Sequence, residues 1–352
     1  MKTVLHFLLT MLKADYTQQE RLPSSQQYIL EYRMIRKFIS QLNGGTTIDD
    51  IFLVQNKDLR TTKNGSLYIQ AQLSDRTGTI DARMWDASTP FFESLGDDTF
   101  LRIKGRTEIY QNKIQLIIKQ ILKTSQEDIQ LEDYLPSTEQ DVNKMFSELK
   151  QIVSSIKQPH LKDLLALFFS DKDFCKRFCS APAAVQYHHA FLGGLLEHTL
   201  SVAKLGDIIA PLYPGLNRDL LICGIILHDI GKISELCYER NFHYSDEGQL
   251  IGHLISGVLM VEERAKQIDG FPKTLLDLLR HLILSHHGEY EWGSPKLPMT
   301  LEALALHYLD NIDAKIHAFN KAILNDKDPN DNWTNYNRML ERKLFKKSHN
   351  YI

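Results

Sequence analysis

The chain has 352 residues, of which 43% are hydrophobic and 24% are charged, and its formal net charge is −3. This length allows two or three domains, and the composition is that of an ordinary globular protein. The small net charge argues against a strongly basic nucleic-acid coat but allows a local basic groove. No apolar run reaches the ~18 residues that span a bilayer, so we expect a cytoplasmic protein without membrane contact.

The first 45 residues are predicted to be an N-terminal extension. The opening sequence MKTVLHFLLTML has an apolar run, but it contains His6, and no small-residue cleavage site follows before Asp15. These features argue against a signal peptide. We therefore expect a short amphipathic or disordered leader, followed by a short helical pattern over 28–42.

Residues 46–125 are predicted to form a small β-barrel. Alternating runs rich in β-branched residues are separated by turn signals, and a short helical stretch is expected at 91–95. About five short strands with such turns are typical of a barrel, with a β-sandwich as the alternative. The turn signals are Asn64-Gly65, Thr77-Gly78 and Gln111-Asn112.

The barrel segment also combines aromatic residues with cations. Aromatic rings can stack on bases while Arg and Lys contact phosphates, so the combination favours a groove for single-stranded nucleic acid. Acidic residues nearly balance the basic ones in this segment, so a simple interaction module is the alternative. The candidate substrate contacts are Tyr68, Trp85, Arg76 and Arg83.

The rest of the chain is predicted to be mostly helical. An acidic connector ends at Pro136, where we expect a linker. Residues 126–185 are predicted to be a helical linker, and nearly all residues from 186 onward are predicted to be helical. The last part, 315–352, is predicted to be a helical, mildly basic tail, whose basic cluster is either a solvated helix face or an RNA contact.

The chain is organised around the stretch 220–232, which reads LLICGIILHDIGK. Apolar residues on every face predict a buried helix, and this helix ends in His228 and Asp229. Burying an adjacent imidazole and carboxylate is costly unless each is paired or holds a metal. Neutral His with ionised Asp suits Mn, Fe, Co or Zn. A hydrogen-bonded pair without a metal is the alternative.

The helical region between 188 and 317 holds an unusual density of histidines. Several lie on apolar helices, where solvated histidines are not expected. Some of them combine with aspartates in the chain order His, His-Asp, His, His, Asp. The residues in this order are His198, His228, Asp229, His253, His286 and Asp310.

This order resembles the HD-domain superfamily of metal-dependent phosphohydrolases. The resemblance implies that the first His, the His-Asp pair and the last Asp hold one divalent ion. Asp229 would bridge to a second ion, which His253 and His286 also hold. Two ions ~3.5–4 Å apart suit phosphodiester hydrolysis. A set of imidazoles and carboxylates without thiolate favours Mn, with Co or Fe as alternatives, over structural zinc.

Asp229 is predicted to be catalytic as well as a metal ligand, and Lys232 and His189 are the other predicted catalytic residues. Lys232, one helical turn beyond the His-Asp pair, is predicted to neutralise a phosphate oxygen. His189 and His287 are predicted to be substrate contacts, general acids or hydrogen-bond partners of the ligands, and His189 could instead only pack the helix start. Asp310 is preferred to Asp313 as the ligand because it is the first Asp of the LD-x-x-D pattern.

Several segments within 34–345 resemble the YhaM-type 3′→5′ exoribonucleases, above all NGSLYIQAQLSDRTG, HHAFLGGLLEH and ILHDIGK. In that family an oligonucleotide-binding (OB) fold precedes an HD domain. The resemblance implies a multi-domain chain, with an all-β OB-fold barrel at 46–125 followed by an all-α HD domain at 186–318 and a tail at 319–352. The barrel would hold single-stranded RNA, and DNA as an alternative, and the HD domain would release nucleoside monophosphates from its 3′ end. The family's usual beginning resembles this chain from Met34 onward, which would make 1–33 a leader or the product of a misassigned start.

Three other functions stay open: an HD-type nucleotide or cyclic-nucleotide phosphohydrolase, a non-catalytic DNA-binding factor, and an acid-stable structural scaffold. SHHGEYEWGSP is similar in outline to a cyclic-dinucleotide phosphodiesterase signature, but it lacks Asp-Gly-x-Gly-Tyr-Pro, and Gly194 stands where that branch has an extra Glu ligand. The complete ligand set argues against the DNA-binding factor, and the buried histidines argue against the scaffold. The oligomeric state is left open, with a homo-oligomer as one option.

Overall fold

A computed structural model describes residues 36–352 apart from short gaps at 97–98, 187–188, 327, 329–330 and 348–352. The chain divides into two compact units, Met1–Ile129 and Gln130–Ile352. The predicted leader at 1–33 and most of the helical pattern over 28–42 lie outside the described residues.

The described end of that helical pattern is a single 3-10 turn, Ile39–Gln41, and not an α-helix. The backbone amide of Ile39 donates to a carboxylate oxygen of Asp75 at 2.6 Å, and the amide of Ser40 donates to Thr77 at 3.1 Å. Side chains of a barrel turn therefore accept hydrogen bonds from the first amides of this segment. These bonds hold the segment against the barrel and take the place of further helical hydrogen bonds.

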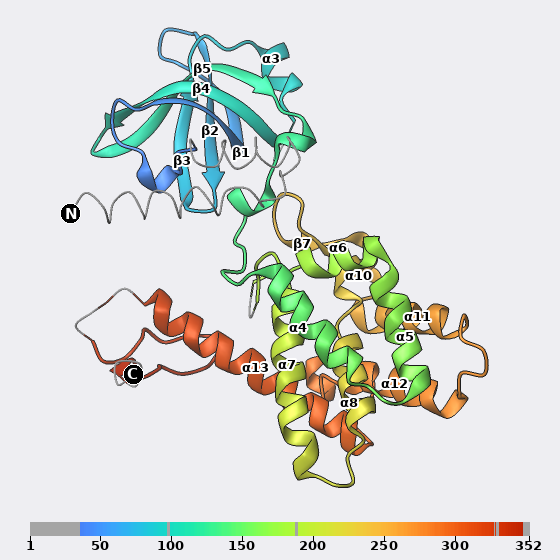
Figure 1. The fold of residues 1–352 in the computed structure, drawn as a ribbon. Coiled ribbons are helices and arrows are strands. Elements are labelled where there is room, and N and C mark those ends of the chain that lie inside the picture. The colour runs from blue at the N-terminus through green and yellow to red at the C-terminus, as the bar shows by residue number, and fades with distance from the viewer. Residues whose placement is uncertain (1–35, 97–98, 187–188, 327, 329–330, 348–352) are drawn as a thin grey trace, which may run out of the picture. The chain divides into compact units, whose positions relative to one another are not determined.

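The first unit contains a closed five-stranded barrel (Figure 1). Neighbouring strands follow the order β1-β2-β3-β5-β4, and β4 also pairs with β1. The β3–β5 pair is parallel and the other pairs are antiparallel. Because the sheet closes on itself, the predicted barrel is confirmed and the sandwich is excluded. The elements are β1 (Thr47–Thr61), β2 (Leu67–Asp75), β3 (Gly78–Met84), α3 (Thr89–Ser94), β4 (Thr99–Tyr110) and β5 (Lys113–Lys123).

Side chains that point into the barrel core alternate along each strand with side chains that point to its outer surface. On β2, Ile69, Ala71 and Leu73 are buried in the core. Their neighbours in sequence point to the opposite side of the strand, so Tyr68 lies on the outside. On β3, Ala82 is fully buried, and Arg83 is therefore outside as well.

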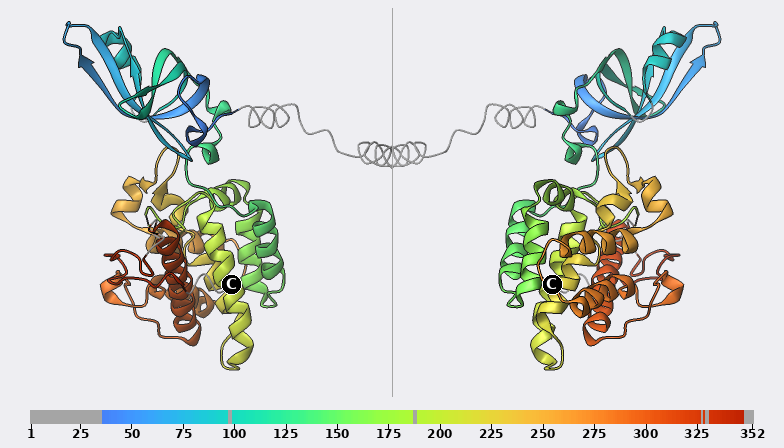
Figure 2. Two further views of the ribbon diagram at one scale, coloured as in Figure 1. Left: turned by 90° about the vertical axis from the view of Figure 1, so that its left-hand side faces the viewer. Right: turned by 90° about the vertical axis from the view of Figure 1, so that its right-hand side faces the viewer.

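The described part of the second unit is mostly helical and also contains a short ribbon of β6 (Leu236–Cys237) and β7 (His243–Tyr244). In Figure 1 the C-terminal part of its last helix, α13, projects away from the other helices, and Figure 2 shows the helical unit from two further sides. None of the helices in the described part of the chain is long and apolar enough to cross a membrane. The helices are α4 (Val142–Ser154), α5 (Pro159–Ser170), α6 (Lys172–Ser180), α7 (Gly194–Ile209), α8 (Arg218–Leu227), α9 (Lys232–Glu235), α10 (Asp246–Leu250), α11 (His253–Ala265), α12 (Lys273–Ser285) and α13 (Leu301–Asn325).

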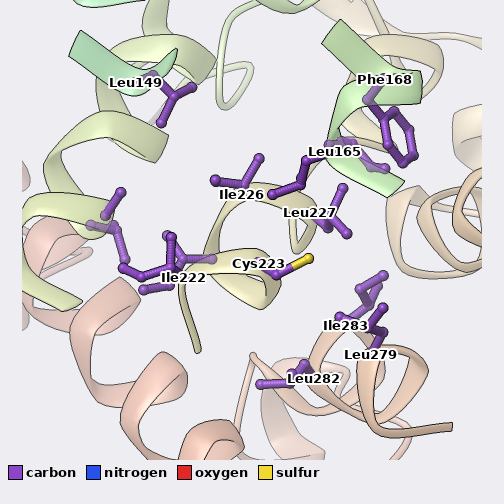
Figure 3. Packing of buried hydrophobic residues seen from close by; sticks show 14 of the residues in the cluster. Leu149, Leu165, Phe168, Ile222, Cys223, Ile226, Leu227, Leu279, Leu282 and Ile283 are labelled. Carbon is purple, nitrogen blue, oxygen red and sulfur yellow. The ribbon is translucent and has the colours of Figure 1, made fainter. Parts of the chain in front are cut away.

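The predicted buried helix is α8. It begins at Asn217, whose side chain accepts a hydrogen bond from the amide of Leu220 at 3.1 Å. Every residue from 220 to 227 is buried, and each large apolar side chain there contributes about 1.5–3 kcal/mol by its burial. The helix is therefore held firmly on all sides, and so is the His-Asp pair at its end. Figure 3 shows its side chains packed among Leu165 and Phe168 of α5 and Leu279, Leu282 and Ile283 of α12.

The expected linker at Pro136 lies inside the second unit. The units divide between Ile129 and Gln130, and Tyr134 and Leu135 are buried. The amide of Leu192 donates to the carbonyl of Pro136 at 2.8 Å. The acidic connector thus packs as the first segment of the helical unit.

The prediction of a helical tail is only partly right. α13 ends at Asn325, and the described residues beyond it contain an isolated bridge between Trp333 and Phe345 in place of a helix. The sequence NDKDPNDN at 325–332 consists mostly of residues that favour turns and helix ends. Asp326 accepts a hydrogen bond from the amide of Asn335 and forms an ion pair with Lys346. These two contacts fold the tail back onto the end of α13.

Candidate metal centre

The six predicted ligands converge from five helices of the second unit. Most of them stand at a helix end, where the buried apolar face of the helix gives way to polar side chains. Four of the six are buried completely or almost so. They are His198 on α7, His228 at the C-terminal cap of α8 with Asp229 directly after it, His253 at the start of α11, His286 at the cap of α12 and Asp310 on α13.

Two of the imidazoles are oriented by the ends of their own helices. His228 Nδ1 lies 2.6 Å from the carbonyl oxygen of Ile225. His286 Nδ1 lies 2.8 Å from the carbonyl oxygen of Ile283. A carbonyl only accepts hydrogen bonds, so Nδ1 carries the proton in both rings, and Nε2 presents a lone pair to the centre.

The other two imidazoles are oriented by carboxylates. His198 Nδ1 lies 2.8 Å from Oδ2 of Asp313, and His253 Nδ1 lies 2.9 Å from Oε1 of Glu235. A carboxylate on the outer nitrogen of a ligand histidine fixes the ring and raises its basicity. Sequence reasoning missed Glu235 because no local pattern marks it; only the tertiary contact reveals its role.

Asp229 lies at the centre, and its two oxygens face different nitrogens. Oδ2 is 3.3 Å from Nε2 of His228 and 3.8 Å from Nε2 of His198. Oδ1 is 3.6 Å from Nε2 of both His253 and His286. One carboxylate thus faces two groups of imidazoles, as a ligand shared by two ions would.

Asp310 completes the first of these groups. Its Oδ1 lies 3.2 Å from Nε2 of His198, on the side of the ring that faces the centre. Asp313 binds the opposite nitrogen of the same ring. This geometry supports Asp310 over Asp313 as the ligand and gives Asp313 the task of orienting His198.

The residues fit a divalent cation. Among the described residues, the buried Oδ1 of Asp229 and Nε2 of His253 have no hydrogen-bond partner, although they lie 3.6 Å apart. Leaving two such atoms unpaired is costly. Ligand atoms that share an ion at about 2.0–2.2 Å are separated by about 3–4 Å, so an ion would pair both. The imidazole and carboxylate donors suit a first-row divalent metal.

The charges of the centre also favour a cation. Burial opposes ionisation of Asp229, but Lys232 and His228 outweigh it and hold the pKa of Asp229 well below its ordinary value. Burial would lower the pKa of His198, yet Asp310 and Asp313 outweigh burial and raise it to about 10. Without an ion, a proton on His198 would balance the carboxylates, and a bound metal would take the place of that proton.

His189 lies behind His198, outside the ring of ligands. Its side chain is only 4% exposed, and its Nε2 lies 3.1 Å from Oδ2 of Asp313, the oxygen that also binds His198. Ser201 donates to the other oxygen of Asp313. Asp313 thus joins His189 to His198, which favours a positioning role for His189 over the predicted contact with substrate.

His189→Ala should keep the metal but slow metal-dependent hydrolysis about 10–100-fold, because it loosens Asp313, the outer partner of His198. His198→Ala should lose metal, because His198 is predicted to supply a coordination bond. Metal analysis after dialysis, together with single-turnover rates, separates the two variants. Equal metal loss would make His189 a ligand, and an unchanged rate and metal content would reduce it to packing.

Lys232 and His287 border the centre. The Lys232 ammonium lies 2.6 Å from Oδ2 of Asp229, so in this structure it orients that carboxylate, and its contact with phosphate stays a prediction. His287 is half-buried, with Nδ1 3.0 Å from the carbonyl oxygen of Trp292. One of its ring nitrogens lies within 4.8 Å of nitrogens of His253 and His286, close enough to meet a substrate bound at the metal.

On the barrel, three of the four predicted contacts share one outer face. The rings of Tyr68 and Trp85 lie 5.0 Å apart, and Trp85 is 43% exposed. The Arg83 guanidinium lies 5.3 Å from the ring centre of Tyr110, another exposed aromatic. Pairing of β2 with β3 brings these side chains together, and they combine rings and cation as a single-strand groove requires.

Arg76 does not join this face. It follows the last residue of β2, whereas Tyr68 stands near the first. Its guanidinium lies 4.4 Å from the ring centre of Phe38. A strand rises about 3.3 Å per residue, so the length of β2 separates Arg76 from the Tyr68–Trp85 pair.

Family models match both units. A model described as an OB-fold nucleic acid binding domain matches residues 53–123, and one described as an HD domain matches residues 195–315. The second match includes all six predicted metal ligands. The predicted fold class, an all-β OB-fold barrel followed by an all-α HD domain, is confirmed.

Curated relatives match most of the chain. The 3′-5′ exoribonuclease YhaM of Bacillus subtilis (strain 168) is 35% identical over 280 residues, which cover 79% of this chain and 88% of the relative. The protein of the same name from Shouchella clausii (strain KSM-K16) is 36% identical, with 79% and 87% covered. That from Bacillus pumilus (strain SAFR-032) is 34% identical over 288 residues, with 82% and 91% covered.

Proposed function

The chain belongs to the YhaM family of 3′-5′ exoribonucleases, and on that premise we propose that its HD unit carries the catalytic centre and its barrel holds the substrate. It is a metal-dependent 3′→5′ exoribonuclease that hydrolyses phosphodiester bonds. The observation that supports this division most strongly is the buried Asp229, whose oxygens face imidazoles on both sides.

The direct test follows a 5′-labelled single-stranded RNA during digestion in the presence of Mn²⁺. We expect a ladder that shortens from the 3′ end, release of nucleoside monophosphates, and arrest by a chelator. Cleavage of mononucleotide or cyclic-nucleotide substrates alone would contradict the assignment and favour a phosphohydrolase. A matched DNA oligomer, used in parallel, decides whether DNA is also a substrate.

We assign the ligands to two ions. His198, His228 and Asp310 hold the first, His253 and His286 hold the second, and Asp229 is shared. When bound, such ions lower the pKa of attacking water and neutralise charge that develops on the phosphate. Mn is proposed as the native metal, with Co or Fe as alternatives, because the donors are imidazole and carboxylate. Restoring activity metal by metal after chelation tests the choice.

The protein's own side chains prepare the centre for this chemistry. Lys232 keeps Asp229 ionised and in place through its 2.6 Å ion pair. Glu235 and Asp313 hold His253 and His198 with the lone pair of Nε2 directed inward. Because these partners fix the rings before substrate arrives, little reorganisation is needed during the reaction. We propose His287 as a contact to the substrate at the mouth of the centre.

The barrel is proposed to retain long substrates. A Met1–Ile129 fragment should bind single-stranded oligonucleotides weakly and with salt-sensitive affinity, and should cleave nothing. A Gln130–Ile352 fragment should keep activity on short oligomers and lose it on long ones. The cut at 129/130 keeps the buried Tyr134 and Leu135 in the helical fragment. Equal degradation of long and short RNA by the helical fragment would contradict a substrate-holding barrel.

A further inference from the structure

The tail beyond α13 folds into a small hairpin, residues 332–346, which we call the tail hairpin. Trp333 and Phe345 pair as an antiparallel bridge, and Asn337 and Arg342 form a second one. In the turn that joins the two arms, the side chain of Asn337 accepts hydrogen bonds from two backbone amides, at 3.0 and 3.1 Å. An Asn that binds amides two and three residues further on stabilises such a turn. The tail is therefore an ordered element of its own.

The tail hairpin is anchored to the C-terminal end of α13. Asp326, directly after this helix, accepts a hydrogen bond from the amide of Asn335 in the first arm at 3.0 Å. Its other carboxylate oxygen lies 2.7 Å from the Lys346 ammonium in the second arm. In Figure 1 the tail lies at the projecting end of α13. One carboxylate thus holds both arms and fixes the hairpin on the helical unit.

One side of the hairpin faces inward and the other faces solvent. Thr334 and Leu344 are both buried, whereas their neighbours Trp333, Lys343 and Phe345 are exposed. Side chains on an extended arm alternate between its two sides, and residues paired across the arms lie on the same side. The indole, the phenyl ring and the lysine ammonium therefore share the solvent side.

The two rings on this side form an open aromatic surface. Their centres lie 5.1 Å apart, yet Trp333 is 48% exposed and Phe345 is 42% exposed. Apolar surface that stays open beside polar residues marks an interaction site. Because the bridge already fixes both rings, a planar ligand can stack on them with little further loss of conformational entropy.

The hairpin also gathers positive charge. Residues 331–347 include five basic and two acidic residues, in a chain whose formal net charge is −3. Arg338, Arg342 and Lys343 are exposed, and none of them forms an ion pair with a residue that the structure describes. Their charge is therefore available to an anionic partner.

We propose that the tail hairpin is a second contact for single-stranded RNA, besides the barrel. Trp333 and Phe345 stack on an unpaired base, and the Lys343 ammonium contacts an adjoining phosphate. Fixed rings beside cations are the combination that binds a single strand without sequence preference. An anionic partner without free bases, such as a duplex, would use only the cations. The open rings therefore favour the single strand.

The hairpin is far enough from the metal centre to hold a different part of the RNA. From Asp310 to Asn325, α13 rises about 22 Å along its axis, and the hairpin is anchored directly after it. A dinucleotide or trinucleotide at the proposed ions is too short to span this separation. Stacked nucleotides rise about 3.4 Å each, so a strand of roughly seven or more can span it. The hairpin would thus bind nucleotides toward the 5′ side of the 3′ end.

This contact rests on the proposed exoribonuclease function, and its first test requires no hydrolysis. Binding of a labelled single strand of about 20 nucleotides, longer than the span, is measured by fluorescence anisotropy without added metal. Trp333→Ala should weaken binding about tenfold or more, and Trp333→Phe should restore most of the loss. Lys343→Ala should reduce the salt dependence by roughly one phosphate contact. Tyr213→Ala and Lys266→Ala remove an exposed ring and an exposed cation elsewhere in the helical unit and should bind like the wild type.

The length and the pairing of the RNA make the test specific. Trp333→Ala should hydrolyse a dinucleotide or trinucleotide at the wild-type rate and with unchanged metal content, because these substrates end before the hairpin. It should bind an RNA duplex as tightly as the wild type does, because paired bases cannot stack on the rings. Equal losses on duplex and single strand, slower hydrolysis of the short substrates, or wild-type binding of the long strand would overturn the proposal.

The RNA contact and the exoribonuclease function can fail separately. If Trp333→Ala loses metal-free binding in a protein that cleaves no RNA, the contact is retained and the exoribonuclease is contradicted. If the protein shortens RNA from the 3′ end while its binding of long strands depends on neither Trp333 nor Lys343, the exoribonuclease is retained and the contact is contradicted.

Discussion

Asp229→Ala should abolish RNA hydrolysis, with a loss of about 10³-fold or more. Asp229 is the one side chain assigned to both ions, and its oxygens face Nε2 of His228 on one side and of His253 and His286 on the other. Losing metal-assisted charge stabilisation costs several kcal/mol, and each 1.36 kcal/mol is a factor of ten in rate. Single-turnover digestion of a labelled RNA measures the loss, and metal analysis measures occupancy.

Two controls make this result interpretable. Asp229→Asn keeps the size of the side chain, so a folded but inactive Asn variant shows that the loss is chemical. Asp269→Ala removes an exposed carboxylate of the same unit and should leave the rate unchanged. Binding of oligonucleotides by the barrel should survive in all three variants. Turnover near that of the wild type in Asp229→Ala, with unchanged metal content, would disprove the whole ligand assignment.

Gly231→Ala should also disable the enzyme, by about 10²-fold in kcat/KM, although it replaces no proposed ligand. Its added Cβ would overlap the carbonyl oxygen of His253 and lie 2.8 Å from the amide nitrogen of Gly257. The first turn of α11 would have to move, and His253 would move with it. A displacement of about 1 Å can cost 10²-fold in rate, and overpacking typically costs about 1–3 kcal/mol of stability.

Gly257→Ala is the matched control on the other side of the same contact. A Cβ there meets its nearest neighbour, a side-chain carbon of Ile283, at 3.5 Å, which is ordinary packing distance. We expect almost normal rates and stability in this variant. Rates and denaturant midpoints of both proteins provide the comparison. Equal behaviour of the two variants would show that the approach of α9 to α11 does not position His253.

The sequence could indicate a metal centre at the His-Asp pair because chemistry and burial coincide there, and the other proposed ligands came from the resemblance to the HD-domain superfamily. His228 and Asp229 end a helix that is apolar on every face, and polar groups in such a place need partners. Glu235 gave no comparable signal, and the LD-x-x-D pattern marked Asp313 only as an alternative ligand. Their task is to hold His253 and His198, and the pairing depends on how helices far apart in sequence are packed.

Other expectations depend on packing in the same way. The sequence groups Arg76 with Tyr68 because both lie in one cation-rich segment, yet they stand at opposite ends of β2. For His189 the sequence leaves a substrate contact, a general acid or a hydrogen-bond partner of the ligands open, and packing buries it against Asp313. A proline is a common sign of a boundary and predicts a linker at Pro136, but Pro136 accepts a hydrogen bond inside the helical unit. The local sequence pattern predicts which helix or strand forms. The contacts of its side chains depend on tertiary packing, which the local pattern does not contain.

The spread of the ligands along the chain has a consequence for biosynthesis. His198 on α7 is the first of them and Asp310 on α13 is the last. Until α13 has left the ribosome, a nascent chain lacks Asp310, the last carboxylate of the proposed metal centre. Metal binding is coupled to folding of the ligand frame, so nuclease activity arises only when the helical unit is complete. If the proposed ligands hold the ions, we therefore expect a nascent chain to be inactive while it is still next to the messenger RNA that encodes it.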